Sequence, residues 1–213
     1  MKRRLFLFLT VCCSLFALWG CGGAGPGAPG SVGCEDFGLI CEADLTPTYL
    51  NTNTDNVDAV QDICDPGPPA VFEDFTDHGA QAAISVRLMN PNTSVTPPQL
   101  FIERFTIEYR RNNDSIGTPP IQADSRSVTF SISPPTGTDI STVTRSIIFV
   151  DLPRKDKYLQ DMSSGIFSSA LNNPAIINNY TAIYTFEGQI EGKKVSIHAT
   201  KDFSIGHYLN CGG

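Results

Sequence analysis

Residues 180–205 read YTAIYTFEGQIEGKKVSIHATKDFSI and hold the clearest structural pattern in the chain. Apolar side chains recur at alternate positions, first at Tyr180, Ala182, Tyr184 and Phe186, and then at Val195, Ile197, Phe203 and Ile205. Such alternation is typical of a β-strand that buries one face. Glu191-Gly192 lies between the two runs and is typical of a tight turn, so this stretch predicts an antiparallel hairpin.

The same period of two extends back to about residue 70. Its members are Ile84, Val86 and Leu88; Phe101, Phe105, Ile107 and Tyr109, expected on one face; Val128, Phe130 and Ile132; and Val143, Ile147 and Phe149. One segment differs, because Asp151 is a typical helix cap with Pro153 in the first turn, which predicts a helix over about Arg154–Met162. We therefore expect residues 70–213 to form an all-β, two-sheet antiparallel sandwich with one short crossover helix.

The N-terminus has the layout of a secretory signal. Lys2, Arg3 and Arg4 precede the apolar run Leu5–Trp19, which at about 15 residues is shorter than the ~20 that a transmembrane helix needs. The run ends in Leu18-Trp19-Gly20-Cys21, where Gly20 leaves a peptidase an open approach. We expect residues 1–20 to be a lipoprotein signal peptide and Cys21 to carry the lipid. The alternative is an ordinary signal peptide that is cut near Gly22–Ala24.

Two further segments precede the expected sandwich. Residues 21–33 are rich in Gly and Pro and predict a flexible tether. Residues 34–69 lack a sustained pattern, so we expect an irregular segment that carries cysteines. The formal net charge is −7, and loss of the three basic residues of the signal makes it −10, which disfavours nucleic acid as a partner.

The cysteine count agrees with export. Of seven cysteines, two lie inside the apolar run and Cys21 is assigned to lipid, which leaves Cys34, Cys41, Cys64 and Cys211. An even number in an oxidising compartment predicts disulfides, and four cysteines allow three pairings. We favour Cys34–Cys41, a local loop, and Cys64–Cys211, which joins the start of the domain to its end. A metal site is the alternative, although the spacings are not those of zinc ligands.

Three blocks carry a family resemblance. Residues 105–111, 148–157 and 184–188, the last followed by Gly192, resemble uncharacterised bacterial lipoproteins with an immunoglobulin-like sandwich, over about residues 57–206. The resemblance implies an immunoglobulin-like form of the sandwich and an envelope location, with palmitate on Cys21, but no activity. Gly22 after the cysteine, by resemblance to bacterial lipoproteins, implies the outer membrane.

A second and shorter resemblance is to the late-embryogenesis-abundant water-stress sandwich. It rests on Asn90-Pro91-Asn92, Tyr109 and Ile116-Gly117.

Catalytic motifs are absent from the sequence. There is no G-x-S-x-G, no S-x-x-K and no H-E-x-x-H. His198 is expected on the polar face of the last hairpin, His78 in a turn, and His207 near the C-terminus. We therefore expect no enzyme activity.

Oxygen-bearing side chains gather in one stretch. Asn51, Asn53, Asp55 and Asp58, with Asn56 and Asp62 beside them, are the ligand types that Ca²⁺ prefers. The stretch lacks the central Gly and terminal Glu of a calcium loop, and Asx-rich loops also hydrogen-bond their own backbone. Calcium is thus an alternative, and otherwise no cofactor is expected.

These observations predict a lipid-anchored envelope protein that binds or scaffolds a partner, either another envelope protein or a glycan. The alternatives are a Ca²⁺- or small-ligand-binding module, and an enzyme with an unrecognised site.

Lipidation at Cys21 has a direct test. Labelled palmitate should enter the wild-type protein expressed in bacteria and should not enter Cys21→Ala, because the thiol is the acceptor. Equal labelling of the two proteins, read by autoradiography, would contradict the assignment.

Overall fold

The structure is a computed structural model that describes residues 30–112, 117–164, 167 and 177–211. The expected signal peptide, Cys21 and most of the tether lie outside these residues. Within the described ranges, no helix is long and apolar enough to cross a membrane.

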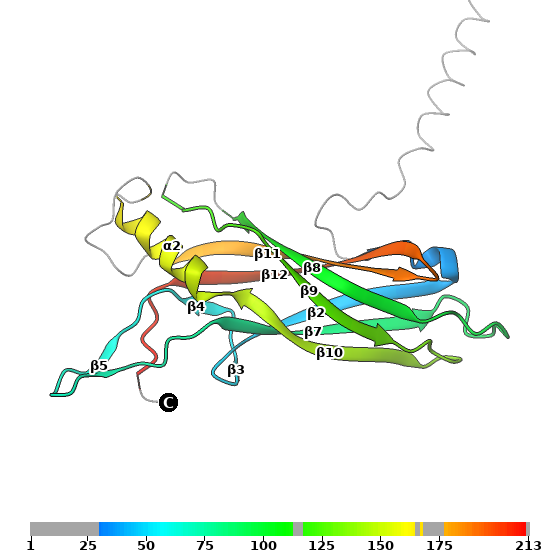
Figure 1. Ribbon diagram of the computed structural model, residues 1–213, viewed down its shortest axis with the longest axis horizontal. Helices are drawn as coiled ribbons and strands as arrows, with labels where there is room; N and C mark the ends of the chain where they lie inside the picture. The colour runs from blue at the N-terminus through cyan, green and yellow to red at the C-terminus, as the bar shows by residue number, and fades with distance from the viewer. Residues whose placement is uncertain (1–29, 113–116, 165–166, 168–176, 212–213) are drawn as a thin grey trace, which may run out of the picture.

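Two antiparallel sheets pack into an elongated sandwich (Figure 1). The six-stranded sheet has the order β1 (Gly30–Val32), β12 (Lys193–Gly206), β11 (Asn178–Ile190), β8 (Leu100–Arg111) and β9 (Asp124–Ile132), and β4 (Asn56–Asp58) adds to β12 in parallel. The four-stranded sheet has the order β10 (Ile140–Val150), β7 (His78–Leu88), β2 (Leu39–Tyr49) and β3 (Thr52–Asn53). A separate ribbon pairs β5 (Ile63–Asp65) with β6 (Val71–Phe72), and a 3-10 turn, η1, spans Glu35–Phe37.

The predicted hairpin forms the centre of the larger sheet. β11 and β12 pair along their whole length around Glu191 and Gly192, both at positive φ. The alternating side chains are buried between the sheets as expected, with Tyr180, Tyr184 and Phe186 fully buried. The all-β sandwich is therefore confirmed.

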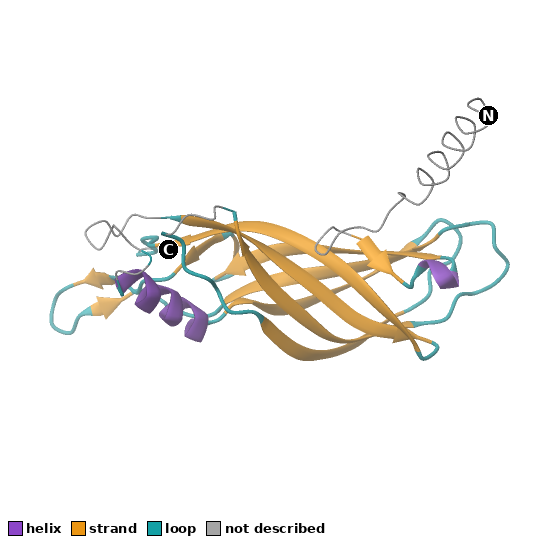
Figure 2. Ribbon diagram, turned by 90° about the horizontal axis from the view of Figure 1, so that it is seen from above, coloured by secondary structure: helices purple, strands orange, loops and turns teal. Residues whose placement is uncertain are grey.

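The predicted helix is also present. α2 spans Leu152–Ser163, and the Asp151 carboxylate accepts a hydrogen bond from the Arg154 amide at 3.2 Å. Pro153 lies in the first turn, where its missing N–H costs nothing. The helix follows β10 of one sheet and precedes β11 of the other in the chain, and Figure 2 shows it from above.

The expectation of an irregular segment over residues 34–69 is wrong. Residues 39–49 form β2, with Leu39, Cys41, Leu45 and Tyr49 on the buried face. Pro47 obscured the pattern, yet its carbonyl accepts from the Thr54 amide on the side away from β7. Since the N–H and C=O of a strand residue point the same way, the missing N–H costs no bond to β7.

The tether is also shorter than expected. Residues 30–32, assigned to it from composition, form β1 and pair with Ser196, Ile197 and His198 of β12. The edge of β12 offers unpaired backbone groups at this point, which explains why a segment without core side chains becomes a strand.

A bulge in β8 overturns one face assignment. Phe101 was expected beside Phe105, but Phe101 is exposed, whereas Leu100 and Ile102 are buried. The pairings of β8 with β9 and with β11 both shift register between Ile102 and Arg104. One extra residue reverses the alternation, which a period count cannot detect.

The bulge lies against Gly188 of β11. A Cβ atom at this glycine would lie 1.9 Å from the Phe101 carbonyl oxygen. Only a residue without a side chain therefore fits beside the bulged backbone.

We expect Gly188→Ala to lower the free energy of unfolding by about 3 kcal/mol, because the bulge must move to admit the methyl group. Gly79→Ala is the matched control in β7, where the nearest atom to an added Cβ is 3.4 Å away. Urea unfolding should show a change below about 1 kcal/mol for the control. Similar losses in both variants would contradict this role for Gly188.

Candidate functional site

The strands β5 and β6 form a small arm at the end of the sandwich that carries α2 (Figures 1 and 2). We use "the arm" for residues 63–72. Its strands pair only with each other among the described residues, and Ile63 lies opposite Phe72. Three of its large apolar side chains are exposed: Ile63 at 54%, Val71 at 53% and Phe72 at 53%. Leu209, in the C-terminal segment beside the arm, is 73% exposed.

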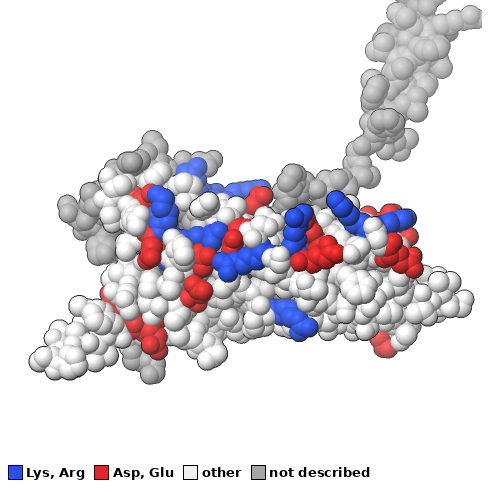
Figure 3. Space-filling view, in the orientation of Figure 1, with Lys and Arg blue, Asp and Glu red and all other residues white. Residues whose placement is uncertain are grey.

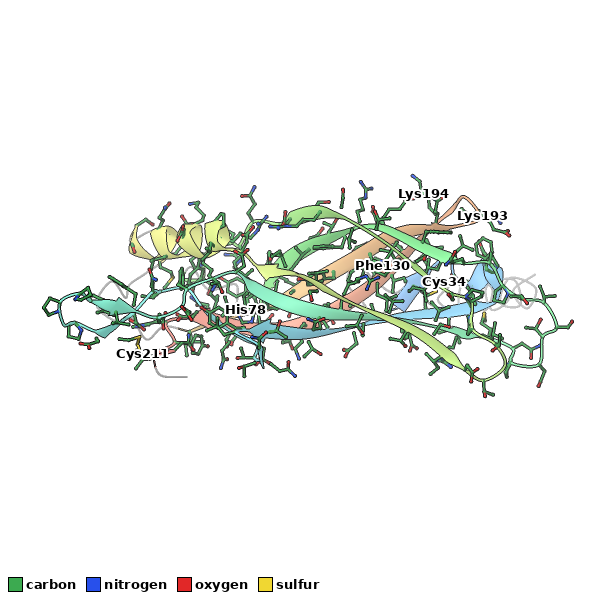
Figure 4. All side chains as sticks on the ribbon, turned by 60° about the horizontal axis from the view of Figure 1, so that its bottom comes forward. Cys34, His78, Phe130, Lys193, Lys194 and Cys211 are labelled. Carbon is green, nitrogen blue, oxygen red and sulfur yellow. A yellow bond between two sulfur atoms is a disulfide. The ribbon has the colours of Figure 1, made fainter. Side chains whose placement is uncertain are left out.

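A disulfide fastens this arm. Cys64 of β5 bonds to Cys211, 147 positions later in the chain, and the other bond joins Cys34 to Cys41. Both expected pairings are therefore present, and Cys34 and Cys211 lie at opposite ends of the sandwich (Figure 4). Closure of so long a loop stabilises the fold by about 5 kcal/mol in the chain-entropy picture. A two-stranded ribbon this short is not stable alone, so the arm needs such a fastening.

Three carboxylates hold the C-terminal segment against the base of the arm. Asp58 accepts hydrogen bonds from the Tyr208 amide at 3.1 Å and from the Asn210 side chain at 2.9 Å. Glu73 accepts from the Asn210 amide at 3.0 Å, and Asp62 lies 2.8 Å from His207 Nε2. We call Asp58, Asp62 and Glu73 the clamp.

Two members of the clamp are buried. Asp58 and Glu73 are almost inaccessible to solvent, and Glu73 Oε1 has no hydrogen-bond partner. Burial, with the Asp58 carboxylate nearby, raises the pKa of Glu73.

Lys155 supplies the buried positive charge behind the clamp. Its Nζ donates to the Thr76 carbonyl at 2.8 Å and lies over the rings of Tyr49 at 4.8 Å and Phe75 at 4.6 Å. Burial lowers the pKa of Lys155 to about 8, while Asp58 opposes that shift. The side chain is therefore still mainly a cation at neutral pH, and α2 is joined to the arm end through it.

His78 is a core residue and not the turn residue that we expected. Its ring is fully buried, stacks on Tyr49 at 5.4 Å and lies 5.6 Å from Phe149 (Figure 4). Nε2 lies 2.9 Å from the Thr54 carbonyl, to which it donates as the neutral tautomer, and Nδ1 has no partner. Burial, with Lys155 nearby, lowers the pKa of His78 to about 4.

The other two histidines contact polar side chains in different parts of the fold. His198 lies on the outer face of its sheet, with Nδ1 3.1 Å from the Thr185 hydroxyl. It lines a shallow groove of about 580 Å³ with Glu42, Asp44 and Ser85, but no hydrogen bond between described residues joins it to a carboxylate. His207 is engaged by Asp62 in the clamp.

The expected calcium ligands do not converge on one site. Asn51 lies in the β2–β3 turn and Asn53 in β3, both on the four-stranded sheet, whereas Asp58 belongs to β4 on the other sheet. Both carboxylate oxygens of Asp58 are used within the clamp. In the described ranges, no three His, Cys, Asp or Glu side chains are grouped to hold a metal.

The proline-rich loop at residues 96–98 takes part in a second groove, at the end opposite the arm. This groove of about 350 Å³ is lined mainly by apolar side chains: Phe37, Leu88, Met89, Val95, Pro97 and Pro98. Neither this groove nor the arm was predicted from the sequence.

Comparisons with known proteins give no family. No family model matches the chain, and no curated protein matches it. One solved structure with some similarity is a solution structure described as a putative late embryogenesis abundant (LEA) protein, with a TM-score of 0.31 and 9% identity over 77% of this chain and 70% of that chain. Similarity at this level carries no argument about fold or function.

His78 makes stability depend on pH. Because its folded pKa is about 4 against an ordinary value of 6.5, the unfolded chain binds more protons between these values, and stability is lost as pH falls through that window. We expect this group to account for about 2 kcal/mol of the loss between about pH 7 and about pH 4.5. Urea unfolding of His78→Phe, whose ring cannot titrate, should show a shallower pH dependence. Equal slopes for the two proteins would refute this assignment.

Proposed function

We propose that this protein is a lipid-anchored, non-catalytic module of the bacterial cell envelope that docks another envelope protein through the arm. The observation that carries the proposal is the exposed apolar set of Ile63, Val71, Phe72 and Leu209 on an element that is rigidly fastened to the domain. Single exposed apolar residues are ordinary on a protein surface. Four of them on one short arm and its adjoining segment are typical of an interaction site.

The fastening of the arm supports binding more than passive structure. The arm contributes none of its own large apolar side chains to the buried core, yet a long-range disulfide and the clamp hold it in place. A surface that is already ordered loses less conformational entropy when a partner binds, which favours affinity. Exposed apolar side chains held in one geometry therefore suit a docking surface.

The anchor is supported by the sequence of the N-terminus. Eight residues separate Cys21 from Gly30, where β1 begins, and they reach at most about 30 Å. A palmitoylated Cys21 would hold the sandwich close to the outer membrane, with the arm at one end of a long domain. Two or three acyl chains give stable retention, whereas one does not.

The proposed role is non-catalytic, because the contacts of the three histidines do not suit catalysis. His78 is held neutral in the core, His207 is engaged by Asp62, and His198 contacts hydroxyl groups. None of these described contacts assembles a nucleophile with a base and an orienting acid. The arrangement favours a binding role.

Site-specific photocrosslinking tests the docking surface. A benzoylphenylalanine in place of Phe72, in the full-length lipoprotein in cells, should give one discrete protein adduct. Phe101 is the matched control, since it is 43% exposed but lies on β8, outside the arm. The adduct should disappear when Ile63→Ser is added, because the cross-strand apolar pair is lost.

Ile63 is exposed, so Ile63→Ser should change the melting temperature little. No adduct from position 72, or the same adduct from position 101, would refute the proposal.

A further inference from the structure

The charges of this chain are divided unequally along its length. Residues 30–86 contain no Lys or Arg, and the first basic residue after the signal is Arg87. Eleven acids occur in the same range: Glu35, Asp36, Glu42, Asp44, Asp55, Asp58, Asp62, Asp65, Glu73, Asp74 and Asp77. This range forms β1 to β6 and most of β7, and it includes the whole arm.

Acids and bases neutralise one another on the rest of the molecule. Arg104 pairs with Glu187, and Lys157 pairs with Asp161. Arg126 and Arg154 both pair with Asp151, at 2.6 Å. Figure 3 shows blue and red atoms interleaved over the sheets and the helix in this way.

Two exposed acids, one in the arm and one just beyond it, have no such neighbours. Asp65 and Asp74 are exposed, and no ion pair between described residues involves either of them. In Figure 3 the base of the arm shows red atoms without blue ones beside them. Lys193 and Lys194 lie at the end of the sandwich opposite Cys211 (Figure 4). Lys155 is the buried cation at this end, and the exposed acids Asp65 and Asp74 add negative charge that no ion pair between described residues offsets.

These two acids flank the apolar set. Asp65 lies opposite Val71 in the ribbon, one step from the pair formed by Ile63 and Phe72. Asp74 follows Phe72 by two positions, just beyond the end of β6. The carboxylate of Asp65 accepts from the Gly67 amide at 2.9 Å, which fixes it at the turn of the arm. An apolar centre with a charged rim is the usual anatomy of a protein interface.

We propose that the arm docks a protein surface that is apolar at its centre and carries Lys and Arg at its rim. This inference rests on the proposed function and adds the chemistry of the partner. Opposite charges at an interface rim speed the encounter and exclude wrong partners. A second copy of this chain would bring the same unbalanced acids to the contact, and an anionic lipid surface or a nucleic acid would be repelled as well.

The test uses full-length protein with benzoylphenylalanine at position 72, in isolated envelopes irradiated at about 0.05 M and about 0.5 M NaCl. The Debye length falls roughly threefold between these concentrations. We expect the adduct yield to fall about fivefold at high salt, and by a similar factor at low salt in Asp65→Asn/Asp74→Asn. Asparagine at position 65 still offers an acceptor to Gly67, so the turn is retained.

The matched control is Asp36→Asn/Glu191→Gln, which removes the same two charges at the opposite end of the sandwich. It should leave the adduct yield unchanged. Isoelectric focusing of the crosslinked partner should give a basic isoelectric point.

The outcomes separate the two proposals. The adduct could be lost with Ile63→Ser and yet be insensitive to salt and to the asparagine variant. That result overturns the proposal of a partner with a basic rim and leaves the proposal of docking through the arm intact. An adduct with the mass of two copies of this chain, or an acidic partner, also overturns it. An adduct that persists with Ile63→Ser refutes the proposed function itself.

Discussion

Burial of the aromatic face of the β11–β12 hairpin is the interaction on which the other elements depend. β11 pairs with β8, which in turn pairs with β9, and β12 pairs with β1 and β4. The hairpin therefore positions all four of these strands. The buried tyrosines remain satisfied, because Tyr180 donates to the Pro119 carbonyl at 2.5 Å and Tyr184 donates to the Ile148 carbonyl at 2.7 Å. Each hydroxyl thus ties the hairpin to a distant segment while its ring fills the core.

The same hairpin positions the candidate site. β12 ends at Gly206, and the chain continues directly into the segment that the clamp and Cys64 hold. β4 pairs with the last residues of β12 and places Asp58 beneath Tyr208 and Asn210. The arm is therefore fastened to the end of the core sheet through the disulfide and the clamp, which favours a preformed docking surface.

Sequence patterns anticipated the regular part of this arrangement. Alternation located the strands from β7 to β12, the Asp151 cap located α2, and the even cysteine count was consistent with the two disulfides. The failures share one cause, because each depended on a partner strand. β1 forms because β12 has a free edge, Pro47 is tolerated because its N–H side faces away from β7, and the bulge in β8 fits because Gly188 makes room.

Local periodicity reports which face of a segment is buried, so the chain alone was sufficient for the all-β class and the helix. The roles of individual polar residues came only from the tertiary structure. Asp58 and Asn210 are 152 positions apart, and nothing near either one shows that they meet. Asp58 resembled a calcium ligand and became part of a clamp, while Asp65 and Asp74 stayed exposed. Burial and neutralisation depend on distant neighbours, and those neighbours exist only in the folded chain.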